Sequence, residues 1–145
     1  MKAEELMIGD WVKLKDAQLG YIKFNGPTVK IEYIVPPNVY VRNYKGLLED
    51  VKDEYLLPIP LTPEILEKNG WKPYIPENHL ETVYTCQDIS KAVADELYAL
   101  WPYQDGSFYL LLRVDGKDMV RKDVHYVHQL QHALRLCEIK KEIEL

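Results

Sequence analysis

The sequence predicts an α+β protein with a small β module over residues 1–58 and an α+β unit over residues 59–145. Three observations support this prediction. Short segments near the start alternate apolar and polar residues with a period of two, as strands with one solvated face do. A proline-rich stretch over residues 55–63 then forms a stiff joint. Near the end, apolar residues recur at helical spacing over residues 123–137.

Four strand-like segments cover residues 11–15, 20–24, 28–35 and 39–43, with turns at Asn25-Gly26-Pro27 and Pro36-Pro37-Asn38. So few residues make a core only if the sheet curls on itself. We therefore expect a small SH3-like barrel, completed by a fifth strand around residues 47–57. The alternation places these side chains inward: Val12, Leu14, Ile22, Phe24, Val29, Ile31, Tyr33, Val35, Val39 and Val41.

The joint leads into the best-marked helix boundary of the chain. Thr62 has the side chain of an N-cap, Pro63 suits the first helical position, and Glu64 favours the positive end of the helix dipole. Asn69-Gly70 predicts the end of this helix, because glycine readily takes the left-handed conformation.

The rest of the second unit mixes strands and helices. Apolar residues at helical spacing predict a helix over residues 88–100, although an irregular excursion between two strands also fits. Asp115-Gly116 is a hairpin signal. The predicted strands cover residues 71–75, 80–86, 107–114 and 118–121.

The long helix predicted over residues 123–137 has two distinct sides. One carries the apolar stripe Val124, Val127, Leu130, Leu134 and Cys137, which needs a sheet or a second helix to cover it. The other side carries His125, His128 and His132, flanked by Arg121 and Arg135. We expect residues 142–145 to add an edge strand or to fray.

Composition narrows the function mainly by exclusion. The 145 residues carry a formal net charge of −5, which argues weakly against general affinity for nucleic acid. Cys86 and Cys137 fit no metal or redox spacing and are expected to be reduced thiols. No secretion signal and no apolar run of membrane-spanning length is visible, so we expect a cytoplasmic protein without membrane contact.

The outward face of the predicted N-terminal sheet is the candidate binding site. Residues 11–45 carry six bases against two acids, a local balance of +4. Bases interleaved with aromatic rings suit phosphates and stacked nucleobases, and small barrels also grip peptides with such faces. Lysine on edge strands also guards against aggregation, and the second unit could cover the rings. The predicted face comprises Trp11, Lys13, Lys15, Tyr21, Lys23, Lys30, Tyr40 and Arg42.

Catalytic patterns are missing from the sequence. No nucleophile elbow, phosphate-binding loop or dinucleotide fingerprint occurs. His128 and His132 are four residues apart, as zinc ligands on a helix are, but Gln129 stands where a general base would be needed. We therefore predict no cofactor, no metal, no small-molecule substrate and no enzyme activity, with a histidine-ligated metal enzyme as a minor alternative.

Three stretches resemble a family of small uncharacterised proteins from Bacteroidetes genomes, prophages and mobile elements. Residues 58–71 resemble the family's "PIPLT…L…GF" joint, residues 126–131 its "YVHQLQ" block, and residues 6–12 its "L-x-I-G-N/D-W-V" start. The resemblance implies a β module followed by an α+β unit, and it carries no activity or catalytic residue. His132 stands where the family pattern has Asn, and Arg135 stands where it has an aromatic residue.

Two functional hypotheses follow. The first is a non-enzymatic interaction or assembly protein of phage or mobile-element origin, whose partner is itself or another protein. The alternative is a nucleic-acid-binding accessory protein that uses the basic aromatic face.

Overall fold

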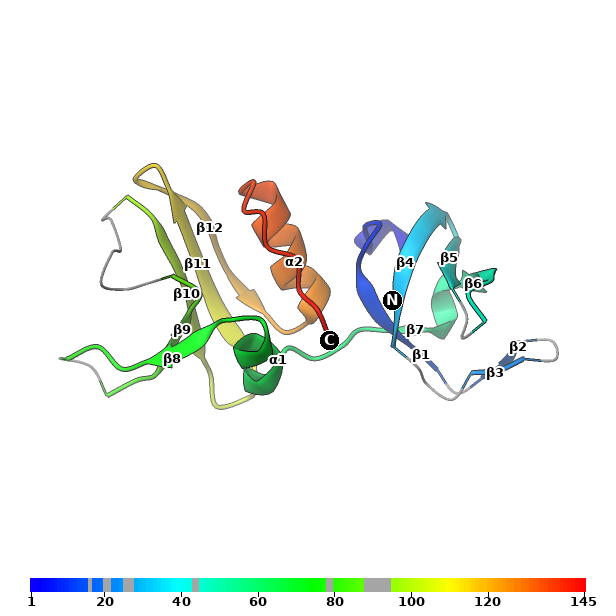
Figure 1. Cartoon of the computed structure of the whole chain (residues 1–145), viewed down its shortest axis with the longest axis horizontal. Helices are drawn as coiled ribbons and strands as arrows, with labels where there is room; N and C mark the ends of the chain where they lie inside the picture. Colours follow the sequence, from blue (N-terminus) through cyan, green and yellow to red (C-terminus); the bar gives the residue numbers. More distant parts are fainter. Residues whose placement is uncertain (16, 20–21, 25–27, 43–44, 78–79, 88–94) are drawn as a thin grey trace. The chain divides into compact units, whose positions relative to one another are not determined.

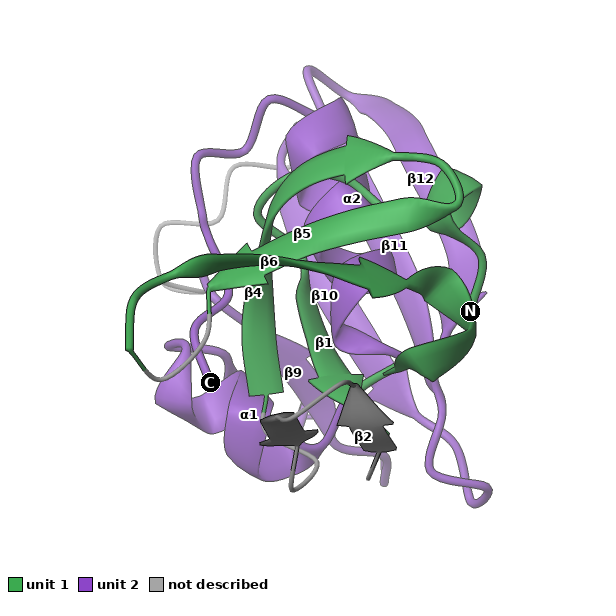
Figure 2. Ribbon diagram, turned by 90° about the vertical axis from the view of Figure 1, so that its right-hand side faces the viewer, with its two compact units in different colours: residues 1–59 green, residues 60–145 purple. Residues whose placement is uncertain are grey.

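The computed structural model describes the whole chain except residues 16, 20–21, 25–27, 43–44, 78–79 and 88–94 (Figure 1), and it describes residues 17–19 and 22–24 by their backbone alone. The described chain divides into two compact units, Met1–Ile59 and Pro60–Leu145 (Figure 2). Each unit contains an antiparallel sheet, and helices are few and short. The predicted α+β class is confirmed.

Unit 1 is a five-stranded antiparallel sheet with the strand order β6-β5-β4-β1-β7. The hairpin β2-β3 forms a separate two-stranded sheet between β1 and β4 in the chain. The elements are η1 (Ala3–Glu5), β1 (Trp11–Leu14), β2 (Ala17–Leu19), β3 (Ile22–Phe24), β4 (Thr28–Val35), β5 (Asn38–Arg42), β6 (Leu48–Lys52), η2 (Asp53–Tyr55) and β7 (Leu56–Leu57).

The link between β6 and β7 forces this sheet to curl. The two strands lie at opposite edges, yet only the three residues of η2 join them. In a flat sheet, four strand spacings would separate the edges by about 19 Å. The four peptide steps from Lys52 to Leu56 span at most about 14 Å even when fully extended. The region predicted as one fifth strand is therefore two strands, which close the sheet from both edges.

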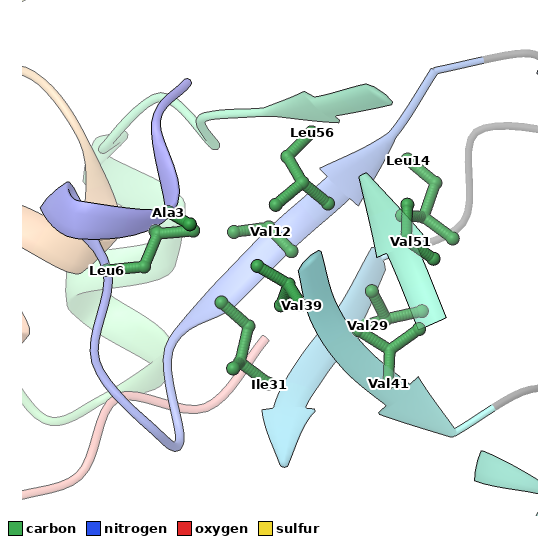
Figure 3. Packing of buried hydrophobic residues seen from close by; sticks show 10 residues of the cluster. All are labelled: Ala3, Leu6, Val12, Leu14, Val29, Ile31, Val39, Val41, Val51 and Leu56. Atoms are coloured by element: carbon green, nitrogen blue, oxygen red, sulfur yellow. The ribbon is translucent and has the colours of Figure 1, made fainter. Parts of the chain in front are cut away.

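The curled sheet encloses the core of unit 1. Val12 and Val39 are fully buried at its centre, as the alternation predicted (Figure 3). Because the sheet curls, one face of a single sheet suffices to bury these residues without a covering helix. The cluster consists of Ala3, Leu6, Val12, Leu14, Val29, Ile31, Val39, Val41, Val51 and Leu56.

The prediction for the second half of β4 is wrong. Tyr33 and Val35 were expected inward but are 56% and 59% exposed, whereas Ile34 packs against the core. The pairing of β4 with β5 shifts register between Ile31 and Tyr33. A β-bulge of this kind adds one residue to a strand and so exchanges the two faces of everything beyond it.

Unit 2 is a meander of five antiparallel strands, in the order β12-β11-β10-β9-β8, with two helices. Asp115 and Gly116 take positive φ angles in the tight turn between β11 and β12, as the predicted hairpin requires. The elements are α1 (Pro63–Lys68), β8 (Lys72–Tyr74), β9 (Val83–Thr85), β10 (Leu97–Pro102), β11 (Phe108–Val114), β12 (Lys117–Val124) and α2 (Val127–Leu136).

The helix predicted over residues 88–100 is wrong in its described part. Residues 88–94 lie outside the described chain, and Leu97–Pro102 is strand β10, which pairs with β9 and β11. Ala99 and Leu100 are both buried although they point to opposite faces of the strand. A strand that is buried on both faces has no alternation, so spacing alone does not distinguish it from a helix.

Helix α1 begins and ends where the sequence predicted. Thr62 Oγ1 accepts a hydrogen bond from the Ile65 amide at 3.3 Å, with Pro63 at the first helical position. The chain leaves the helix through Asn69 and Gly70, whose φ is +78°. Glycine is required here because this left-handed conformation strains other residues.

Helix α2 begins at Val127, four residues later than predicted. Val124 belongs to β12, where it is fully buried. The side chain of Gln129 fixes the start, because its Oε1 accepts hydrogen bonds from the amides of His125 at 2.8 Å and Tyr126 at 3.2 Å. This reach back from the third helical position satisfies amides that have no partner within the helix.

The apolar side of α2 is buried within unit 2, as predicted for this helix. Val127, Leu130, Ala133 and Leu134 are at most 1% exposed, and α2 lies against β12 (Figure 1). His128 was expected on the opposite, outward side but is only 7% exposed. The burial therefore extends around the helix beyond the predicted stripe.

Helix α2 ends in a reversal of the chain at Glu138. The Ile139 amide donates to the Leu134 carbonyl at 2.9 Å, and the Glu138 amide donates to the Arg135 carbonyl at 3.0 Å. These two bonds form a Schellman motif, which places Glu138 in the left-handed region with φ of +57°. Glutamate is strained in this conformation, which glycine usually occupies.

The segment after this reversal, residues 140–145, is fixed by two side-chain amides. Gln131 on α2 donates to the Lys141 carbonyl at 3.2 Å and accepts from the Ile143 amide at 2.6 Å. Asn69 donates to the Glu144 carbonyl at 2.7 Å and accepts from the Glu144 amide at 2.8 Å. Ile143 is 1% exposed. The segment neither extends a sheet as an edge strand nor frays.

We expect Ile143→Ala to lower the free energy of unfolding of unit 2 by about 2–4 kcal/mol, because a buried aliphatic side chain is truncated. Ile143→Val, which removes one methylene, should cost about 1 kcal/mol. Urea unfolding followed by tryptophan fluorescence measures both, since Trp71 and Trp101 report on unit 2. Equal stability of Ile143→Ala and the parent protein would mean that the segment is not docked in solution.

Candidate functional site

The centre of the predicted face lies on the adjacent strands β1 and β4. Trp11 and Lys30 are direct cross-strand partners. The Lys30 Nζ atom lies 5.5 Å from the centre of the Trp11 ring, which is within the range of a cation–π interaction. Both side chains are half-buried, and the neighbouring Lys13 is exposed. The structure thus places Trp11 and Lys30 side by side, with the exposed Lys13 two residues further along β1.

The part of the face on β5 carries both signs of charge. Arg42 Nε donates to Glu32 Oε1 at 3.2 Å, and Arg42 Nη1 donates to the Gly46 carbonyl at 3.0 Å. Tyr40 is the cross-strand partner of Asp50 on β6. The face is therefore less basic than residues 11–45 suggested, because Asp50, which lies outside that range, joins Glu32 among the predicted bases.

Three other predicted residues do not belong to this centre. Lys15 is exposed beyond the end of β1, where its Nζ atom donates to the Glu54 carbonyl. Lys23 belongs to the separate hairpin β2-β3, in which its backbone pairs with Gln18. Tyr21 lies outside the described residues. The outer face is defined below as Trp11, Lys13, Lys30, Glu32 and Arg42 on the curled sheet.

The sequence did not reveal that the acidic residue Glu32 is a neighbour of the bases of the outer face. Glu32 was visible as an outward residue of β4, but its pairing with Arg42 depends on the strand register. The register shift at Ile31 and Tyr33 determines which residues of β4 and β5 meet. Nothing in the sequence marks that shift.

The histidines of α2 form an aromatic row with Tyr126. The Tyr126 and His128 rings are stacked with centroids 5.8 Å apart, and the His128 and His132 rings meet edge to face at 5.6 Å. His125 is exposed, whereas His128 is buried. In the part of the chain that the structure describes, no group of three histidine, cysteine or acidic side chains is placed to hold a metal.

A shallow hollow of about 530 Å³ lies beside strands β8 and β9, and Cys86 is its one sulfur-bearing residue. Burial raises the pKa of the Cys86 thiol, and the positive charge of Lys141 only partly opposes this effect. Burial likewise raises the pKa of the Cys137 thiol. Since the thiolate is the reactive form, both cysteines are poor nucleophiles at neutral pH. The lining residues are Gly70, Lys72, Pro73, Tyr74, Thr85, Cys86 and Gln87.

We expect iodoacetamide to alkylate Cys86 in the folded protein several-fold more slowly at pH 7.5 than in urea. The raised pKa lowers the thiolate fraction, and burial restricts access. Because the pKa of Cys86 is raised, its alkylation rate in the folded protein should keep rising at pH values at which the rate in the unfolded protein has already levelled off. Peptide mass spectrometry separates Cys86 from Cys137. A folded-state rate equal to the unfolded rate would contradict the half-buried thiol with its raised pKa.

None of the helices in the described chain is long and apolar enough to cross a membrane. No family model, no curated protein and no solved structure matches this sequence.

Proposed function

We propose that the chain is a non-enzymatic interaction or assembly protein whose outer face binds a protein partner. The observation that carries this proposal is the composition of that face. The half-exposed Trp11 ring lies beside Lys30, Lys13 follows on the same strand, and β4 and β5 contribute the Arg42–Glu32 ion pair. Tryptophan and arginine are enriched among the residues that dominate binding energy at protein interfaces.

Within this proposal, unit 1 is an SH3-like barrel. Its strand order supports the assignment, because the last short strand, β7, returns to pair with β1 after the 3₁₀ turn η2. A hairpin, β2-β3, also follows the first strand, as in barrels of this type. The resemblance of residues 58–71 and 126–131 to the mobile-element family supports a phage or mobile-element origin.

The mixed charge of the outer face favours a protein over a nucleic acid. A nucleic acid presents a continuous row of phosphates, which Glu32 and Asp50 repel where they lie beside Arg42 and Tyr40. A protein surface can present acidic, basic and apolar groups in turn. The partner we infer carries carboxylates opposite Lys13 and Lys30 and an apolar or aromatic group opposite Trp11.

We expect Lys13→Glu combined with Trp11→Ala to reduce capture of the protein partner at least about tenfold, since both changes remove groups at the centre of the face. Pull-down from host lysate with nuclease, quantified by mass spectrometry, measures this loss. Lys117→Glu combined with Met119→Ala on β12 is the matched control, because it also reverses one charge and truncates one large side chain, at exposed residues of unit 2. Equal loss with the control pair would exclude the outer face as the contact.

Nucleic-acid binding is the second candidate, and the Trp11–Lys30 pair with the exposed Lys13 is the observation that favours it. We expect only weak binding to a labelled single strand of about 20 nucleotides at low salt, and none at physiological salt, because few phosphate contacts are available. Fluorescence anisotropy in a salt series measures this. Tight binding at physiological salt that Lys13→Glu abolishes would place the nucleic-acid hypothesis first.

A further inference from the structure

The site that holds residues 140–145 has the properties of a peptide-binding site. Asn69 and Gln131, called the amide clamp here, each bind the main chain of the segment through one donated and one accepted hydrogen bond. Hydrogen bonds to the main chain recognise an extended peptide whatever its side chains are. The clamp therefore provides affinity without sequence selectivity.

Two further contacts supply the selectivity. Ile143, held between the two clamp residues, is the buried anchor at 1% exposure. Arg135 donates from Nη2 to Glu142 Oε2 at 3.0 Å and from Nε to Glu142 Oε1 at 3.4 Å, a two-pronged contact with the preceding residue. The site thus selects a segment in which an acidic residue precedes an aliphatic one.

The clamp is poorly stable when empty. Gln131 is only 3% exposed, and both groups of its side-chain amide are used by residues 141 and 143. If the segment leaves, water takes over these hydrogen bonds, but the apolar surface that Ile143 covers is exposed, which is unfavourable. A copy of the protein whose segment has left therefore has a strong tendency to take up a replacement.

The connection between α2 and the segment favours its departure. Only Glu138 to Lys140 join the end of the helix motif to the clamped residues, and Glu138 is strained at φ of +57°. Opening this hinge releases the strain, whereas all clamp contacts can form again between two copies. Short hinges under strain are known to promote exchange of identical elements between protomers.

We propose that residues 140–145 of a second copy of this chain occupy the amide clamp, giving a reciprocal dimer by exchange of this segment. A second copy fits the site because its segment has Glu142 for the contact with Arg135 and Ile143 in the next position as the buried anchor. Within one copy, the tethered segment competes at a high effective concentration, so the dimer forms at high protein concentration. The proposal is independent of the outer face of unit 1.

A charge exchange on full-length protein tests this proposal. In the variant Arg135→Glu, the new carboxylate repels Glu142 of the same chain. In the variant Glu142→Arg, the new guanidinium group repels Arg135 of the same chain. In a mixed dimer, each site receives the segment of complementary charge. Arg135 and Glu142 side chains are 25% and 54% exposed, so both variants should fold. Native mass spectrometry resolves the mixed dimer from the two homodimers.

We expect the ratio of mixed dimer to homodimer to exceed its statistical value at least about tenfold, since two ion pairs replace two repulsive contacts. The double variant Arg135→Glu with Glu142→Arg should behave like the parent protein. Ile143→Asp should abolish the dimer, and an excess of the peptide with the sequence of residues 140–145 should dissociate it. Glu138→Gly should lower the association constant of the dimer about tenfold, because it removes the strain from the monomer.

Three results would overturn the proposal. The first is protein that stays monomeric up to about 1 mM, where the tethered segment no longer has an advantage. The second is a statistical mixture of dimers. The third is a dimer that is unaffected by both Ile143→Asp and the peptide, because such a dimer forms through another surface. Dissociation of the dimer by an unrelated acidic peptide that lacks isoleucine would also contradict the selectivity of the site.

Discussion

Each of the two five-stranded sheets has an apolar face that must be covered, and this constraint decides most of the structure. In unit 1 the sheet covers itself, because the three residues of η2 draw its edge strands together around Val12 and Val39. In unit 2 the cover is α2, whose Leu130 and Leu134 are fully buried. The outward side of the first sheet is therefore not needed to bury the core of unit 1.

The sequence predicted elements well where one side of an element is solvated. The alternation in β1 and the cap of α1 at Thr62 were readable because polar and apolar positions differ. Prediction failed where burial is two-sided, as in β10, since a continuous apolar run has no period. It also failed beyond the bulge in β4, where an unmarked register shift turned Tyr33 outward.

The candidate site shows the same division between local pattern and tertiary pairing. Alternation along single strands correctly placed Trp11 and Lys13 on the outward side of β1. It did not reveal that Glu32 pairs with Arg42, because cross-strand neighbours depend on register. A face that looked basic in the sequence is therefore mixed in the structure. The change matters for function, since a mixed face discriminates between protein partners through complementary charge but binds a polyanion poorly.

Residues 138–145 show most clearly how tertiary contacts override local preference. Glutamate, lysine, isoleucine and leucine make up this whole stretch, and most of them have good helix propensity, yet α2 ends at Leu136. Propensity differences amount to only a few tenths of a kcal/mol per residue. The four hydrogen bonds from Asn69 and Gln131 contribute about 1 kcal/mol each, and burial of Ile143 adds about 2 kcal/mol. The clamp, and not the local sequence, therefore determines the conformation of this segment. If another segment occupies the clamp, residues 140–145 lose the contacts that fix their conformation.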